Sequence, residues 1–181
     1  METLELKRVL RDVEETEFDC GIDTINDMVK NSYYPFIAQH AYTYSIIYKE
    51  KIIGYIQIML RDINISSFPD DISDINPEIR DGTITSMHIN FLAIDQRCQR
   101  KTFGTYALKM MISRVDKFAK EWPIRVITID AREELVTWYE RIGFKRMSKN
   151  FDGQSGYNVA MYMSCLKYGD ELEEYLKSQY E

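Results

Sequence analysis

The sequence predicts an α/β protein in which strands alternate with amphipathic helices around an apolar core. Residues 90–105 read NFLAIDQRCQRKTFGT, which is a short apolar strand, a polar loop and the start of a helix. Residues 42–60 contain two strand-like runs joined by a polar pair, a pattern typical of a β-hairpin. Residues 102–129 contain a long amphipathic stretch and then an apolar run of the kind that forms buried parallel strands.

Composition narrows the class of protein. The chain has 181 residues, of which 45% are hydrophobic and 29% charged, and this predicts a single domain over residues 1–181. It has no apolar run of membrane-spanning length and no signal-peptide pattern, so the predicted location is cytoplasmic. Three scattered cysteines, Cys20, Cys98 and Cys165, lack zinc-ligand spacing, which predicts free thiols and no metal.

The net charge of the chain indicates which classes of binding partner suit it. The formal charge of −6 weighs against a broad nucleic-acid footprint, which normally needs a basic face. It fits a cationic or amine-bearing acceptor better. A local basic groove can survive an acidic average, so tRNA is not excluded.

The N-terminal part is predicted to supply three strands and two short helices. Asp23 or Thr24 is the expected N-cap of the first helix. Glu50 and Lys51 are expected to form the hairpin turn, and Gly54 inside a strand indicates a bulge or a close backbone approach. The predicted elements are strands at 4–10, 42–48 and 52–60, a helix at 23–30, and a second short helix beginning at Asn31 or Ser32.

Residues 61–82 are rich in Asp, Ser, Pro and Asn, which predicts a long loop with little regular structure. Loops of this length are often lids or binding loops. The alternative is a mobile surface insertion.

The C-terminal part is predicted to alternate strands with helices. A central strand is expected over 83–94, followed by a helix over 102–120. The apolar face of that helix is predicted to be Tyr106, Leu108, Met111, Ile112, Val115 and Phe118. The remaining elements are a strand at 124–129, a helix at 133–141 closed by Gly143, hairpin strands at 144–147 and 157–166, and a C-terminal helix at about 169–180 that caps the domain or joins a homodimer.

The junction between the central strand and the long helix is a candidate phosphate site. A helix N-terminus presents backbone N–H groups and partial positive charge, which together bind phosphate. Gln99, Arg100 and Lys101 add side-chain donors and positive charge. The alternative is an ordinary strand–loop–helix unit with a solvated basic loop.

Two stretches carry a family resemblance. FLAIDQRCQRKTFGTYAL resembles the acyl-CoA-binding motif of the GNAT acetyltransferase superfamily, with Gln99, Thr102 and Gly104 on the Q/R-x-x-G-x-G/A positions. Thr102 replaces the usual first glycine, a departure that narrows the backbone approach to the pyrophosphate. VTWYERIGF at 136–144 is similar to the family's A-x-x-F/L-Y-E-K-x-G-F segment. FDCGIDTIN at 18–26 resembles the opening of a branch that includes acetyltransferase toxins of toxin–antitoxin pairs.

The resemblance implies the GNAT fold: a mixed, mostly antiparallel sheet of about seven strands with helices on both faces. Two parallel central strands, near 87–94 and 124–130, are expected to splay apart and expose backbone groups to acetyl-CoA. Strand backbone should pair with pantetheine, the loop backbone should hold the pyrophosphate, and Arg100 and Lys101 should reach the 3′-phosphate. Arg132, where relatives have asparagine, touches pantetheine or lies in solvent. The implied acetyl-CoA residues are Leu92, Ala93, Ile94, Gln99, Arg100, Lys101, Thr102, Phe103, Gly104, Thr105 and Arg132.

The resemblance also implies the catalytic residues. Tyr139 falls on the tyrosine that protonates the departing CoA sulfur; its alternative role is packing against Trp138 and Phe144. Histone-type members have a glutamate six residues before the end of the strand, and counting back from Ile94 gives His88. A histidine has a suitable pKa for a general base, although His88 can equally be a packed strand residue. It shares a strand face with Ile94 if no bulge intervenes.

The implied function is acetyl-CoA-dependent transfer of acetyl to a primary amine of a small molecule or peptide. Two alternatives remain open at this point. One is a toxin that acetylates aminoacyl-tRNA, and the other is a non-catalytic acyl-CoA sensor in which Thr102 and the missing glutamate mark lost catalysis. The family arrangement also implies that the loop over residues 61–82 takes part in acceptor selection, because it enters the strand that holds the acyl group. Acceptor identity does not follow from the sequence.

Overall fold

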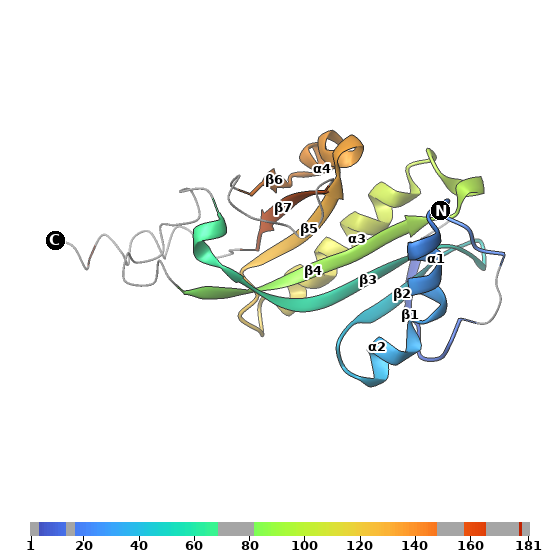
Figure 1. Ribbon diagram of the computed structural model, residues 1–181, viewed down its shortest axis with the longest axis horizontal. Helices are drawn as coiled ribbons and strands as arrows, with labels where there is room; N and C mark the ends of the chain where they lie inside the picture. Colours follow the sequence, from blue (N-terminus) through green and yellow to red (C-terminus); the bar gives the residue numbers. More distant parts are fainter. Residues whose placement is uncertain (1–3, 14–16, 69–81, 148–157, 166–177, 179–181) are drawn as a thin grey trace. The chain divides into compact units, whose positions relative to one another are not determined.

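The computed structural model describes residues 4–13, 17–68, 82–147, 158–165 and 178 (Figure 1). Seven strands form a sheet in the order β1-β2-β3-β4-β5-β7-β6. The strands are β1 (Glu5–Arg8), β2 (Tyr42–Tyr48), β3 (Lys51–Asn64), β4 (Thr83–Ile94), β5 (Val126–Arg132), β6 (Lys145–Arg146) and β7 (Asn158–Ser164). The helices are α1 (Asp23–Lys30), α2 (Tyr33–Ile37), α3 (Phe103–Phe118) and α4 (Val136–Ile142), with short 3-10 turns η1 (Ile65–Ser67), η3 (Gln96–Cys98) and η4 (Glu133–Leu135). The prediction of a seven-stranded mixed sheet flanked by helices is confirmed.

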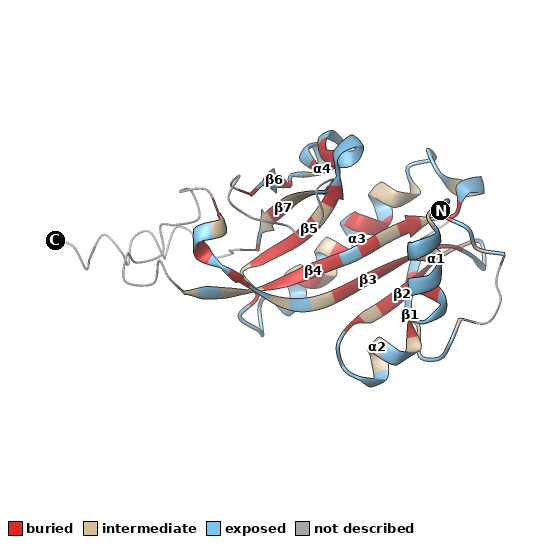
Figure 2. Ribbon diagram, viewed as in Figure 1, coloured by how far each residue is buried: buried red, intermediate tan, exposed pale blue. Residues whose placement is uncertain are grey.

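The chain divides into two compact units. The first unit is Met1–Leu60 with Met87–Lys117, and the second is Arg61–Ser86 with Phe118–Glu181. Figure 2 shows buried residues concentrated along β3, β4 and β5. That residues 1–181 form one domain and that β4 and β5 splay apart both stay predictions.

The β2–β3 hairpin organises the first unit. Tyr48 pairs with Lys51, so the turn is Lys49–Glu50, and the predicted turn at Glu50–Lys51 is wrong by one residue. Both turn residues are left-handed, with φ of 49° and 62°, which matches the twist that two-residue hairpins favour. Gly54 fulfils both of its predicted roles. The register shifts beside it, because Ile46 pairs with Gly54 whereas Ile47 pairs with Ile52, and a Cβ on Gly54 would lie 2.4 Å from the Ala93 carbonyl oxygen.

Helices cover both faces of the sheet in the first unit. The Arg114 guanidinium of α3 lies 5.0 Å from the Tyr44 ring centroid and donates to the Leu6 carbonyl at 3.1 Å. Tyr44 pairs with Ile56, so the neighbouring Tyr55 points to the opposite face. There Tyr55 packs in a buried cluster with Val29 of α1. Hence α1 and α3 lie on opposite faces, as Figure 1 also shows.

Two helix predictions need correction. The N-cap of α1 is Ile22, without a side-chain hydrogen bond, so neither Asp23 nor Thr24 caps it. The buried residues of α3 are Ala107, Leu108, Met111 and Val115. Tyr106 and Phe118, predicted on the apolar face, are exposed. Tyr106 lies outside the stripe set by these spacings, and Phe118 lies in the last turn.

The second unit is built on β5, β6 and β7. Strand β7 pairs antiparallel with β5, from Val126↔Ser164 to Arg132↔Asn158, and with β6. The predicted hairpin strands are therefore confirmed. Its predicted turn, residues 152–156, and the C-terminal helix at 169–180 lie outside the described ranges, apart from Ser178.

The predicted loop over residues 61–82 is wrong at its start. Strand β3 continues to Asn64 and leads into η1, where the Ile65 amide donates to the Gly82 carbonyl at 3.0 Å. Ile63 and Phe68 are buried in the core of this unit. The alternation of Asp62, Ile63 and Asn64 is a strand pattern that the loop-forming composition concealed. Residues 69–81 lie outside the described part of the chain.

Candidate functional site

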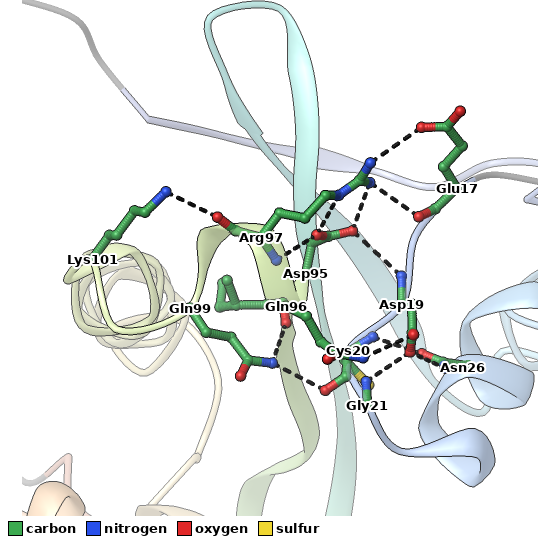
Figure 3. Close-up of polar contacts among 11 residues, drawn as sticks. Glu17, Asp19, Cys20, Gly21, Asn26, Asp95, Gln96, Arg97, Gln99 and Lys101 are labelled. Carbon is green, nitrogen blue, oxygen red and sulfur yellow. Dashed lines mark hydrogen bonds and ion pairs between the residues drawn. The ribbon is translucent and has the colours of Figure 1, made fainter.

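The loop that leaves β4 is anchored by Asp95, whose side chain is buried. Its carboxylate accepts a hydrogen bond from the Arg97 amide at 2.9 Å, which caps η3. The same carboxylate accepts from the Arg97 guanidinium at 2.9 and 3.0 Å. This bidentate pair sets the direction in which the chain leaves the strand (Figure 3).

The N-terminal segment is tied to the same loop. The Asp19 amide donates to the Asp95 carboxylate at 3.4 Å, and the Gln96 amide donates to the Asp19 carbonyl at 2.8 Å. The Arg97 guanidinium contacts the carboxylate and the carbonyl of Glu17, at 3.1 and 3.0 Å. We call Glu17, Asp19, Asp95, Gln96 and Arg97 the loop clamp. It joins residues separated by about eighty positions in sequence, which sequence reasoning missed.

The FDCG motif, residues 18–21, fixes the orientation of Asp19 within the loop clamp. One Asp19 oxygen accepts from the Gly21 amide at 2.7 Å and from the Asn26 side chain at 2.8 Å, while the other accepts from Gln96 at 2.8 Å. Asn26 in turn accepts from the Cys20 amide at 3.0 Å. Gly21 is left-handed, with φ of 83°, which explains the glycine at this turn.

Two carboxylates of the loop clamp, Asp95 and Asp19, are stabilised in their ionised form. Hydrogen bonding by the Arg97 side chain holds the pKa of Asp95 below its ordinary value, despite the opposing effect of burial. The Gly21 amide, followed by Asn26, does the same for the pKa of Asp19. Asp95 and Asp19 are therefore ionised at neutral pH.

The three predicted side-chain donors differ in what they do. The Gln99 amide nitrogen donates to the carbonyls of Cys20 and Ile94, at 3.0 and 2.9 Å, so it closes the loop onto the strand end. The Lys101 ammonium donates to the Arg97 carbonyl at 2.9 Å. Arg100 is exposed and left-handed, with φ of 59°.

Thr102 has a backbone conformation that normally favours glycine. Its φ is 65°, in the left-handed region that β-branched residues avoid. Its hydroxyl donates to the Lys101 carbonyl at 2.5 Å, and its carbonyl accepts from the Tyr106 amide at 3.1 Å, where α3 begins. Holding threonine there costs about 1–2 kcal/mol.

The first turn of α3 contains Phe103, Gly104 and Thr105, all half-buried. The Phe103 ring lies 4.9 Å from the Tyr48 ring, which fixes the start of the helix against the β2–β3 hairpin. The first turn of any helix directs N–H groups beyond its end. The strand, loop and helix start therefore have the geometry expected of an anion site.

Strand β4 contains a bulge that the sequence did not reveal. Asn90 donates to the Gln57 side chain at 2.6 Å, and Ile94 lies opposite Gly54, where a Cβ would be 2.9 Å from the Ile94 side chain. Four residue steps separate Asn90 from Ile94 along β4, whereas three steps separate their partners Gln57 and Gly54 along β3. Strand β4 thus has one extra residue, and side-chain alternation shifts between these two contacts.

The bulge changes the position inferred for His88. His88 shares the face of Asn90, so the premise that it shares a face with Leu92 and Ile94 does not hold. Its side chain is buried, with 5% exposed. Leu92 and Ile94 are half-buried, whereas Ala93 is buried in the core cluster beneath α1.

Tyr139 lies on α4 in the second unit and is buried. Its ring packs edge-on against Trp138 and Phe144, with centroids 4.6 and 5.6 Å away. Gly143, left-handed with φ of 115°, ends the helix and returns Phe144 to this contact. Burial raises the pKa of Tyr139 above its ordinary value, so the phenol is protonated at neutral pH.

The predicted residues thus fall into two groups. His88 and the stretch from Leu92 to Thr105 lie in the first unit, and Arg132 and Tyr139 lie in the second. Arg132 is exposed and pairs with Glu134. The three cysteines are free thiols, as predicted.

Two further kinds of site are absent from the described residues. They contain no group of three or more His, Cys, Asp or Glu side chains arranged to hold a metal ion. None of the helices in the described ranges combines the length and apolar character needed to cross a bilayer.

Comparison with known proteins agrees with this geometry. Residues 77–165 match the family described as "Acetyltransferase (GNAT) domain", and no curated protein sequence matches the chain. A crystal structure of a bacterial toxin has a TM-score of 0.75 at 16% identity, covering 98% of this chain and 97% of that chain. A mutant of KacT has a TM-score of 0.75 at 17% identity, covering 97% and 99%. AtaT complexed with acetyl-methionyl-tRNAfMet has a TM-score of 0.73 at 17% identity, covering 96% and 99%. At these identities the likeness establishes the fold.

Proposed function

We propose that this chain, whose residues 77–165 belong to the GNAT acetyltransferase family, transfers acetyl from acetyl-CoA directly to a primary amine. The observation that carries the proposal is the junction between β4 and α3. There Asp95 anchors the loop, and Thr102, at the position of the family's first glycine, has a left-handed backbone. A loop maintained in this conformation despite its cost indicates a retained anion site.

Acetyl-CoA is assigned to the first unit, which contains the end of β4 and the start of α3. The half-buried positions Leu92 and Ile94 offer strand backbone to the pantetheine arm. The pyrophosphate is assigned to the backbone from Gln99 to Thr105, at the start of α3. Exposed Arg100 and Lys101 supply positive charge for the 3′-phosphate.

In the proposed reaction, a neutral amine attacks the thioester carbonyl carbon. A backbone N–H of β4 stabilises the oxyanion that develops. The carbon–sulfur bond then breaks, and the CoA thiolate takes a proton from the Tyr139 phenol. The new amide nitrogen gives its extra proton to solvent, and solvent reprotonates Tyr139. Positioning of the two substrates supplies much of the rate. Before the attack, His88 is assigned as the base that takes a proton, directly or through water, from the ammonium form of the acceptor to give this neutral amine.

A more specific acceptor has support from one solved structure. AtaT complexed with acetyl-methionyl-tRNAfMet shares this fold with a TM-score of 0.73. The α-amine of an aminoacyl ester is a primary amine, so the same chemistry serves an aminoacyl-tRNA acceptor. The net charge of −6 requires that such an enzyme collect basic residues locally.

The test is release of free CoA thiol from acetyl-CoA in the presence of spermidine, glycinamide, a peptide N-terminus or methionyl-tRNA. Release with one acceptor class, together with the acetylated product by mass spectrometry, supports the transferase and identifies the acceptor class. A kcat/KM that is higher by orders of magnitude with methionyl-tRNA than with the other amines would favour aminoacyl-tRNA as the acceptor. Acetyl-CoA binding without release on any acceptor would support the sensor alternative and overturn the proposal.

A further inference from the structure

A chain of three uncharged polar side chains crosses one face of the sheet in the first unit. The Gln57 amide nitrogen donates to the Thr43 hydroxyl at 2.9 Å. The Gln57 amide oxygen accepts from the Asn90 amide nitrogen at 2.6 Å. Thr43 and Gln57 are 0% and 2% exposed, whereas Asn90 is exposed. The chain therefore leads from a buried anchor to one accessible amide.

This arrangement is expensive for a purely structural role. Gln57 lies among the buried residues Tyr55, Ile56 and Ile58 of β3, where an apolar side chain would avoid the cost of burying an amide. A fully hydrogen-bonded buried network instead rigidifies its members. Here the member that gains a defined orientation at the surface is Asn90.

The orientation of Asn90 determines what it can bind. Its amide nitrogen faces Gln57, so its carbonyl oxygen is the group presented away from the network. Asn90 lies on the α1 face of the sheet, because its partner Gln57 shares a strand face with Tyr55, which packs against Val29 of α1. Asn90 lies two residues before Leu92, which is at most about 7 Å along a bulged strand, and Leu92 begins the segment assigned to the pantetheine arm.

We propose that Asn90 is an acceptor-binding residue whose carbonyl oxygen accepts a hydrogen bond from an N–H of the attacking amine. Gln57 and Thr43 are positioning residues that hold the Asn90 amide in this orientation. An uncharged acceptor oxygen suits a neutral amine, whereas a carboxylate would favour the unreactive ammonium. The selected class is primary amines, which have one N–H for Asn90 and another to lose in the reaction. This inference rests on the proposed function.

The first experiment measures steady-state kinetics of Asn90→Ala with glycinamide and its N-methyl analogue sarcosinamide as amine probes, and with methionyl-tRNA. Loss of one neutral hydrogen bond corresponds to a fall of about five- to tenfold in kcat/KM for the acceptor. The preference for glycinamide over sarcosinamide should narrow. The acetyl-CoA Kd, measured by calorimetry, should be unchanged.

The second experiment separates positioning from folding. Thr43→Val removes the anchor hydroxyl and should raise the acceptor KM. Thr43→Ser keeps the hydroxyl, so its acceptor KM should stay near the wild-type value. Ser45→Ala is the matched control, because Ser45 is buried on the same strand face but donates to the Lys7 carbonyl at 3.1 Å, outside the chain. It should leave the acceptor KM unchanged.

The outcomes distinguish this inference from the function on which it rests. If wild type releases no thiol with any acceptor, both fail. If wild type is active but Asn90→Ala keeps the acceptor KM and the glycinamide preference, the Asn90 assignment fails alone. If Thr43→Val and Ser45→Ala raise the acceptor KM equally, the positioning role of Thr43 is overturned.

Discussion

The buried carboxylate of Asp95 receives the guanidinium of Arg97 through two hydrogen bonds, at 2.9 and 3.0 Å, while also accepting from the Arg97 amide at 2.9 Å. A residue at the end of a strand thus holds both the backbone and the side chain of a residue two positions later. Because Arg97 also contacts Glu17, the loop before α3 and the N-terminal segment depend on the same ion pair. A substitution of Asp95 therefore tests how far the loop conformation depends on this ion pair.

Asp95→Asn should destabilise the protein by about 1–3 kcal/mol at pH 7, because the hydrogen bonds it loses are charge-assisted. The pKa of Asp95 is lowered in the folded state, so its contribution is present above the unfolded value of 3.8 and is lost as pH falls below it. Urea denaturation across pH should show a shallower acid decline in the variant. Asp27→Asn, at an exposed position on α1, is the control, and equal effects of the two changes would contradict the assignment.

Thr102→Gly should stabilise the protein by up to about 1 kcal/mol, because glycine adopts the left-handed conformation without a Cβ penalty. Removing the side chain should also let a pyrophosphate approach the backbone more closely. We expect a lower acetyl-CoA Kd by calorimetry. Thr102→Ala keeps the Cβ and should show neither gain. Weaker binding by Thr102→Gly would mean that the threonine side chain itself contacts the ligand.

Gly54→Ala should be strongly destabilising, by roughly 2 kcal/mol or more, because the new Cβ would lie 2.4 Å from the Ala93 carbonyl oxygen. A backbone carbonyl cannot rotate out of the way as a flexible side chain can. The whole of strand β4 near Ile94 would therefore have to shift. Thermal denaturation measures the loss, and acetyl-CoA affinity should fall with it. Ile52→Ala on the same strand, where the side chain is 48% exposed, should cost much less. A similar melting temperature for both variants would show that β4 accommodates the change.

Local patterns in the sequence predict much of the architecture, and the errors have physical causes. The role of Gly54 is predictable because glycine weakens a strand interior and therefore usually marks a bulge or a close backbone approach. The composition of residues 61–64 indicates a loop because Asp and Asn are turn formers, although Ile63 and Ile65 keep the period of a strand. The predicted hairpin turn is displaced by one residue because Lys49, Glu50 and Lys51 are all charged. Composition does not show that the left-handed pair is Lys49 and Glu50.

The candidate site is less predictable, because it depends on contacts between distant segments. The acyl-CoA motif directs attention to Gln99 and Thr102, but nothing local in the sequence indicates that Gln99 donates to Cys20. The face inferred for His88 depends on an unbroken strand. A bulge leaves no mark in an alternating apolar run, so only the contacts of Asn90 and Ile94 reveal it.

Tyr139→Phe should lower kcat by about 10²–10⁴-fold if the phenol protonates the CoA thiolate, the usual range for a general acid. The ring contacts with Trp138 and Phe144 do not use the hydroxyl, so stability near pH 7 should change little. Thiol-release kinetics, with acetyl-CoA Kd as the control for binding, measure the effect. Unchanged kcat would leave Tyr139 as a packing residue.

The pH dependence of this variant gives a second, independent check. Burial raises the pKa of Tyr139 above its unfolded value of 10.0. The folded state then holds the phenol proton where the unfolded state loses it, so the stabilisation is complete below pH 10 and declines above it. Wild-type turnover should therefore show no fall from Tyr139 ionisation below pH 10. In Tyr139→Phe, the loss of stability above pH 10 should be shallower than in wild type. A wild-type alkaline limb near pH 8 that persists in Tyr139→Phe would place that ionisation on another group.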